Sequence, residues 1–149
     1  MSPEGSEPKP GIVLRRPVAY WIIVTEEFRK EMAEELQQAA DNVQAQLDQL
    51  DFESRRYLLD LQKADLSRAM SVRDEIEKEK RKQQRYKEEM LSQKEKVSQL
   101  PDGELFLRGT LEGTVVASVG ENLKDLLGGA EIVVKDNLIV EIKDGKREG

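Results

Sequence analysis

The sequence contains no cysteine and no histidine. Without cysteine the chain has no disulfide, no thiol nucleophile and no thiolate metal site. Without histidine it lacks the commonest general base and the commonest transition-metal ligand. The longest apolar run, residues 18–24, is too short to cross a bilayer. We therefore expect a non-catalytic protein of the cytoplasm, with no cofactor, no metal site and no membrane contact.

Glycine and proline are absent from residues 26–100, a stretch of 75 residues rich in Glu, Gln, Lys, Arg, Leu and Ala. These residues are good helix formers, whereas helices in globular proteins average about 10–14 residues. A continuous helix of this length would extend roughly 110 Å. The stretch therefore predicts a coiled-coil rod, which is either one long helix or two helices that fold back on each other.

The distribution of charge favours the fold-back. Residues 26–64 contain ten acidic and five basic side chains, whereas residues 65–100 contain eight acidic and ten basic ones. The apolar spacing fades within residues 65–71, so we place the fold-back there. The numbers of two facing residues then sum to about 132. In this register the basic run 78–87 faces three carboxylates in residues 45–54. Opposite charges beside the seam select partner and orientation in coiled coils. We predict an antiparallel helical hairpin, with the single long helix as the alternative.

The apolar seam of this rod is expected at positions three and four residues apart. In the first arm these positions are Met32, Leu36, Ala39, Val43, Leu47, Leu50, Ser54, Tyr57, Leu61 and Ala64. In the second arm they are Val72, Ile76, Tyr86, Met90, Val97 and Leu100. The step from Val43 to Leu47 breaks the heptad alternation, which predicts local unwinding of the supercoil at that point.

The segments on either side of the rod have the composition of strands. β-Branched and aromatic residues dominate residues 12–25, which predicts a strand with two apolar faces. Pro101 and Gly103 end the rod. In residues 101–143 we expect strands at 104–111, 114–119, 131–135 and 138–142, a helical turn at 121–127, and a two-residue hairpin turn at Asp136 and Asn137.

These expectations define an α+β fold class. It comprises an N-terminal strand, a long antiparallel coiled-coil helical hairpin, and a small C-terminal antiparallel β domain that the first strand completes. Residues 1–11 are expected to be a disordered tail and residues 144–149 a polar tail, because neither segment has apolar residues enough to bury.

Three motifs link these segments: Val24-Thr-Glu-Glu-Phe-Arg-Lys-Glu before the rod, Leu100-Pro-Asp-Gly-Glu-Leu after it, and Ile132-Val-Val-Lys-Asp-Asn-Leu-Ile-Val-Glu-Ile near the end. In this combination the sequence resembles the YlqD family of small bacterial proteins over nearly its whole length. The family has no assigned activity. The resemblance therefore implies the fold and a bacterial cytoplasmic location, but no catalytic residues. Family members carry Gly where Asn137 stands here, and both residues tolerate the turn conformation.

The sharpest candidate for a partner-binding site is the basic run of the second arm. Its residues are Lys78, Lys80, Arg81, Lys82, Arg85 and Lys87. Such a run on a helix is able to neutralise the phosphates of RNA or DNA. However, the chain carries a net charge of −6, and Tyr86 is the only aromatic residue nearby. We therefore expect this face to be solvated and paired with the acidic arm. Arg15 and Arg16 are a weaker candidate for a basic surface.

Three functions fit these features. We expect an interaction or scaffold protein that self-associates as a homo-oligomer and binds a protein partner whose identity the sequence does not give. The first alternative is an RNA- or ribosome-associated factor that uses the basic second arm. The second is a holdase-like chaperone that uses apolar residues at the distal tip, around Leu66, Met70 and Val72.

Overall fold

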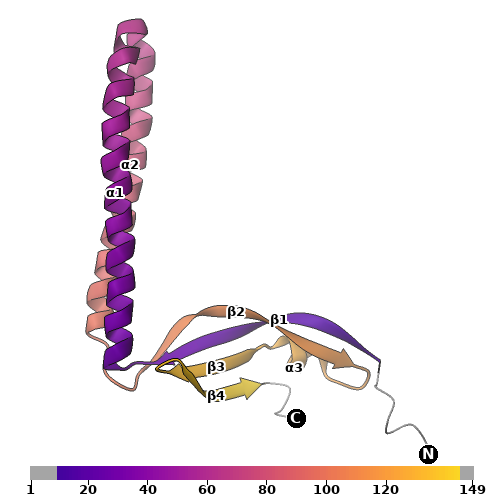
Figure 1. Cartoon of the computed structure of the whole chain (residues 1–149). Coiled ribbons are helices and arrows are strands. Elements are labelled where there is room, and N and C mark those ends of the chain that lie inside the picture. Colours follow the sequence, from indigo (N-terminus) through magenta and orange to yellow (C-terminus); the bar gives the residue numbers. More distant parts are fainter. Residues whose placement is uncertain (1–9, 145–149) are drawn as a thin grey trace, which may run out of the picture. The chain divides into compact units, whose positions relative to one another are not determined.

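The computed structural model describes residues 10–144 and has the predicted α+β fold (Figure 1). Its elements are β1 (Gly11–Ile23), α1 (Glu26–Ala64), α2 (Leu66–Ser98), β2 (Leu105–Ser118), α3 (Leu123–Leu127), β3 (Ala130–Lys135) and β4 (Leu138–Asp144). The chain forms two compact units, a helical unit Glu26–Leu100 and a sheet unit built from the segments on either side of it. Of the tails expected at residues 1–11 and 144–149, residues 1–9 and 145–149 lie outside the described residues, whereas Gly11 is the first residue of β1. Within residues 10–144, no helix has the length and hydropathy needed to cross a membrane.

The helices α1 and α2 form the predicted antiparallel hairpin (Figure 1). They are separated by one residue, Asp65, whose backbone is extended at φ −157° and ψ 96°. The Asp65 N–H donates to the Leu61 carbonyl over 2.8 Å, and its carboxylate accepts from the Arg68 N–H over 3.1 Å. Asp65 therefore closes the last turn of α1 and caps the first turn of α2.

The seam between the helices differs from the expected one at four positions, Ala39, Tyr57, Ala64 and Tyr86. Ala40 is fully buried, whereas the neighbouring Ala39 is only half-buried. Tyr57 and Tyr86 are about half exposed, and Ala64 is exposed as well. The half-buried Leu58 takes the inner position beside Tyr57.

The use of Ala40 restores the heptad spacing. Buried and half-buried residues alternate at steps of four and three through Leu36, Ala40, Val43, Leu47 and Leu50. The predicted irregularity between Val43 and Leu47 was therefore wrong. Ala39 and Ala40 have the same side chain, so local sequence does not distinguish which of them faces the partner helix.

The sheet has the strand order β2-β1-β3-β4. β1 pairs antiparallel with β2 and parallel with β3, and β3 pairs antiparallel with β4. The sheet is therefore mixed, and the expectation of an antiparallel sheet was wrong. β3 runs parallel to β1 because the chain leaves β2 through the short helix α3 and enters β3 in the same direction as β1.

β2 is a single strand where two were expected, because two glycines lie inside it instead of in turns. Arg108 bulges out of the pairing with β1, and Gly109 is the next residue. A Cβ at Gly113 would lie 2.7 Å from Cγ2 of Val18, so the missing side chain makes room for the neighbouring strand. Glycine at both positions therefore serves the strand rather than ending it.

β3 and β4 form the predicted hairpin, with Asp136 and Asn137 at φ 49° and 70° as its two turn residues. Asp144 was expected to begin the polar tail, but it is the last residue of β4. β3 can approach β1 because Gly129 has φ 83° and no side chain. A Cβ at this position would lie 2.7 Å from the Pro17 carbonyl oxygen.

Candidate functional site

Three lysines of α2 reach across to α1 and form what we call the lysine ladder. The Nζ atoms of Lys80, Lys87 and Lys94 donate to Asp51, Gln44 and Gln37 over 2.8, 2.7 and 2.7 Å. The lysines are seven residues apart, and so are their partners, so each pair of residue numbers sums to 131. The observed register is thus within one residue of the predicted one.

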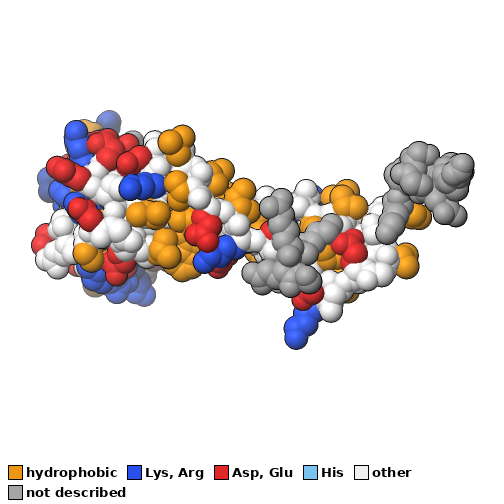
Figure 2. Space-filling view, turned by 90° about the horizontal axis from the view of Figure 1, so that it is seen from below, with side chains coloured by type: hydrophobic (Ala, Val, Ile, Leu, Met, Phe, Trp, Pro, Cys, Tyr) orange, Lys and Arg blue, Asp and Glu red, His pale blue; other side chains and the backbone are white. Residues whose placement is uncertain are grey.

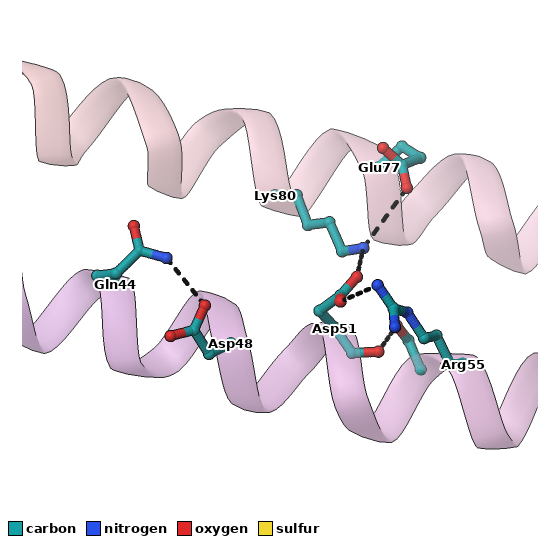
Figure 3. Close-up of polar contacts among 7 residues, drawn as sticks. Gln44, Asp48, Asp51, Arg55, Glu77 and Lys80 are labelled. Atoms are coloured by element: carbon teal, nitrogen blue, oxygen red, sulfur yellow. Dashed lines mark hydrogen bonds and ion pairs between the residues drawn. The ribbon is translucent and has the colours of Figure 1, made fainter.

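Lys80 is more enclosed than its partner Asp51, with 23% of its side chain exposed against 39%. It lies between Asp51 of α1 and Glu77 of its own helix, and Asp51 also pairs with Arg55 over 2.8 Å (Figure 3). The hydrogen bond to Asp51 raises the pKa of Lys80 against the opposing effect of burial. The same bond lowers the pKa of Asp51, assisted by the charges of Arg55 and Lys80.

These shifts predict a pH window for the ladder's contribution to hairpin stability. The Asp51 contribution is present above its unfolded pKa and is lost as the pH falls through the lowered folded value. The Lys80 contribution is present below its unfolded pKa and is lost as the pH rises through the raised folded value. The pair therefore stabilises the hairpin between about pH 4 and about pH 10.

We expect Asp51→Asn to lower the melting temperature of the helices more at pH 7 than at about pH 2, because the stabilisation by the Asp51 carboxylate is lost as the pH falls through its lowered folded pKa. Circular dichroism at the helix band measures this difference. Asp48→Asn is the matched control, because Asp48 accepts a hydrogen bond from Gln44 of its own helix and is exposed. An equal loss for Asp51→Asn at both pH values would contradict the role of the charge.

The six predicted partner-binding residues fall into two groups. Lys80 and Lys87 belong to the lysine ladder and face α1. The other four are exposed, and their spacing puts them on one side of α2, which we call the outer basic face: Lys78, Arg81, Lys82 and Arg85. Within residues 10–144, none of these four forms an ion pair. Together with Glu75 and Glu79 they line a shallow depression.

The flank of the hairpin away from the ladder is open. A groove runs there between the helices, lined by Ala39, Asn42, Val43, Gln46, Glu79, Lys82, Gln83 and Tyr86. Gln83 donates its amide to Glu79 over 3.1 Å, while its buried Oε1 has no hydrogen-bond partner among the described residues. The lysine ladder thus closes one flank of the seam, and small and amide side chains leave the other flank accessible.

The sheet contains a buried ion pair that the sequence analysis missed. Both guanidinium NH groups of Arg16 in β1 donate to the Asp144 carboxylate in β4, each over 3.0 Å. The two side chains are 8% and 21% exposed, and the hydrogen bond to Asp144 raises the pKa of Arg16. Arg16 is therefore unavailable to the basic surface suggested above. Arg15 is exposed and lies 3.4 Å from Glu112.

The last strand exposes an apolar surface at the edge of the sheet. Its apolar residues Leu138, Ile139, Val140 and Ile142 are 71%, 59%, 53% and 60% exposed, and we call them the β4 surface. Hydrophobic side chains gathered at the surface of the chain are visible in Figure 2. Edge strands of monomeric proteins are usually short, charged or covered, because an open apolar edge invites pairing with another chain. The β4 surface has the composition of a protein-binding surface.

Cross-strand pairing divides the residues of β4 between the two faces of the sheet. On one face Ile142 pairs with Ile132, which pairs with Tyr20 of β1. On the other face Lys143 pairs with Glu131. At Ile142 one face of this edge is therefore apolar, and at Lys143 the other face is charged; Leu138 lies on the charged face opposite Lys135, and Asp144 lies on the face of Ile142 opposite Ala130.

Comparison with known proteins identifies the family. The family model described as YlqD protein matches residues 12–143. The chain belongs to the YlqD family. The matched residues include both the lysine ladder and the β4 surface, so both lie within the part that the YlqD family model describes.

A solved structure has the same fold as this YlqD family member. It is the crystal structure of a protein of unknown function from Synechococcus sp. WH 8102, with a TM-score of 0.79 and 21% sequence identity. The similarity covers 90% of this chain and 95% of the cyanobacterial one. No curated protein matches the chain.

Sequence reasoning missed the β4 surface as a candidate site, although the signal was present. Leu138, Ile139 and Val140 are consecutive, so a strand made from them has apolar side chains on both faces. Such a run is typical of a strand that is covered on both faces, yet these three residues of β4 are exposed.

Proposed function

We propose that this protein is a non-catalytic interaction protein that binds another polypeptide through the sheet, with the β4 surface as the contact. The observation that carries the proposal is the exposure of four large apolar residues on one edge strand. Burying a large aliphatic side chain completely stabilises a complex by about 1.5–3 kcal/mol. A binding partner that buries the exposed parts of these β4 side chains therefore gains several kcal/mol of binding free energy.

The helical hairpin supports a scaffold role. Its lysine ladder fixes the register of two helices of 39 and 33 residues, and the open flank leaves side chains of both helices accessible. A long helical hairpin with fixed register is suited to holding a bound partner at a set place along its length.

The proposal is tested by affinity capture from a nuclease-treated bacterial lysate with three proteins. Wild type is compared with the double variant Leu138→Thr, Ile139→Thr, in which threonine keeps the strand propensity. The control is Leu66→Gln, Met70→Gln, because these residues are 61% and 62% exposed near the turn of the hairpin. We expect the β4 variant to lose captured protein about tenfold, which corresponds to about 1.4 kcal/mol of lost burial.

The outcomes separate the alternatives. Capture that is equal for wild type and the β4 variant would overturn the proposal. Loss only in the Leu66, Met70 control would instead support a chaperone-like tip of the hairpin.

Binding of RNA is the second candidate, and it rests on the outer basic face. Its four cations are exposed and form no ion pairs within residues 10–144, but the exposed carboxylates Glu75, Glu79, Glu88 and Glu89 lie beside them on α2. An RNA-binding surface of this size predicts affinity that falls steeply with salt. Replacing Lys78, Arg81, Lys82 and Arg85 by Glu would abolish such binding and leave the lysine ladder intact.

A further inference from the structure

We infer that β4 pairs with β4 of a second copy of this chain, antiparallel and centred on Ile142, so that two four-stranded sheets join edge to edge. The inference rests on the proposed function, because it names the partner of the β4 surface. The support for the inference is that one register of this pairing places opposite charges beside each other and an apolar residue opposite its own copy.

Charge selects the register. In a two-fold antiparallel pair each residue lies opposite one whose number is fixed by the centre of the pair. With Ile142 at the centre, Glu141 of each copy lies opposite Lys143 of the other. A centre at Glu141 instead places two glutamates opposite each other, and like charges in that position are destabilising. Val140 as the centre leaves Glu141 opposite Ile139. Among these three centres, Ile142 alone pairs both charges.

The same register joins the faces of the two sheets. On the charged face Lys143 lies between Glu131 of its own chain and Glu141 of the second copy, so the charges alternate in sign across the junction. On the other face Ile142 meets its counterpart, and the row from Tyr20 through Ile132 to Ile142 continues into the second copy. Glu141 and Lys143 therefore pair with opposite charges and Ile142 meets Ile142, while Val140 lies opposite Asp144, whose carboxylate is bound by Arg16 of its own chain.

The other edge of the sheet is less suited to this pairing. β2 has a bulge at Arg108 and glycines at positions 109 and 113, and bulges interrupt the regular backbone that a new strand requires. β4 has an irregularity near Val140, but its part from Glu141 onward pairs regularly with β3. The Arg16–Asp144 ion pair holds the end of this regular part in place.

The size of the contact sets the expected affinity. Pairing centred on Ile142 uses the described residues 140–144 of each copy, which is small beside the 1,200–2,000 Å² of a standard interface (about 20–30 residues on each side). We expect reversible dimerisation with a dissociation constant in the range of about 10–100 µM.

Engineered cysteines test the register directly, since the chain has no cysteine of its own. In the proposed pair Ile142 lies opposite itself, with Cβ atoms about 4.5–5.5 Å apart, which is close to the distance that a disulfide spans. Under mild oxidation we expect Ile142→Cys to form a covalent dimer on a non-reducing gel. Leu138→Cys is the control, because it is more exposed on the same strand but does not face itself. Absence of the Ile142→Cys dimer, or equal dimer from both variants, would overturn the inference.

Exchange of the two charges provides a second test that does not depend on cysteine. Sedimentation velocity is measured for Glu141→Lys and Lys143→Glu, separately and mixed in equal amounts, at about 10–300 µM. We expect each variant alone to weaken dimerisation about tenfold and the mixture to restore it, because lysines of one variant then face glutamates of the other. The control Glu112→Lys changes the net charge by the same amount as Glu141→Lys, but on the other edge strand, and leaves dimerisation unchanged.

These results are distinguishable from a failure of the proposed function. A wild-type chain that stays monomeric over this concentration range overturns the second copy as the partner. If the lysate capture still depends on Leu138 and Ile139, the β4 surface then binds a different polypeptide. Dimerisation that the mixture of charge variants does not restore would place the contact elsewhere on the chain.

Discussion

Replacing Asp144 by alanine is expected to lower the free energy of unfolding of the sheet by about 3 kcal/mol, because it leaves the buried guanidinium of Arg16 without its counter-charge. This value is at the low end of the range for breaking a buried pair, since part of the Asp144 side chain is exposed. Trp21 in β1 is the only tryptophan of the chain, so its fluorescence during urea unfolding reports on the sheet.

Two further variants are compared with Asp144→Ala. Glu112→Ala removes the partner of Arg15 in a solvent-exposed pair of the same sheet and is expected to cost less than about 1 kcal/mol. The double variant Arg16→Met, Asp144→Leu replaces both charges by apolar groups and is expected to recover most of the loss. If Asp144→Ala were no more destabilising than Glu112→Ala, the buried pair would have no structural role.

The second large effect is expected at Leu126, the buried residue of α3. This helix contacts β1 and β2, and Leu126 is only 2% exposed. Leu126→Ala should cost about 2–5 kcal/mol of sheet stability, because it removes most of a buried side chain and leaves a cavity. The midpoint of urea unfolding, followed by Trp21 fluorescence, measures this loss of stability.

The same short helix provides its own control. Leu127 is 46% exposed, so Leu127→Ala removes the same atoms from a position that buries fewer of them. We expect it to cost clearly less than Leu126→Ala. Equal losses from the two variants would mean that α3 contributes helix propensity rather than packing.

The sequence was sufficient to predict the helical hairpin. Absence of glycine and proline gave the length of the rod, and the opposite charge of its arms gave the register to within one residue. Both signals are repeated many times along the chain, so a local irregularity does not hide them. Single seam positions such as Ala39 and Ala40 were less certain, because neighbouring identical residues carry no information about which faces inward.

The sheet was harder to predict, because its main features depend on contacts between distant residues. A strand's residues do not show whether its neighbour runs parallel or antiparallel, so the pairing of β1 with β3 was missed. Arg16 and Asp144 are 128 residues apart, and no local pattern links them. The apolar run of β4 was visible, but its position at the sheet edge follows from the strand order.

The single residue that separates α1 from α2 has a consequence for how the hairpin changes length. No loop lies between the helices to absorb a shift. An insertion in one arm therefore separates the partners of every lysine-ladder pair that lies farther from Asp65 than the insertion. The rungs repeat every seven residues, so the contacts are kept when both arms gain or lose the same whole number of heptads. Viable length variants of this hairpin should therefore differ by multiples of fourteen residues in total.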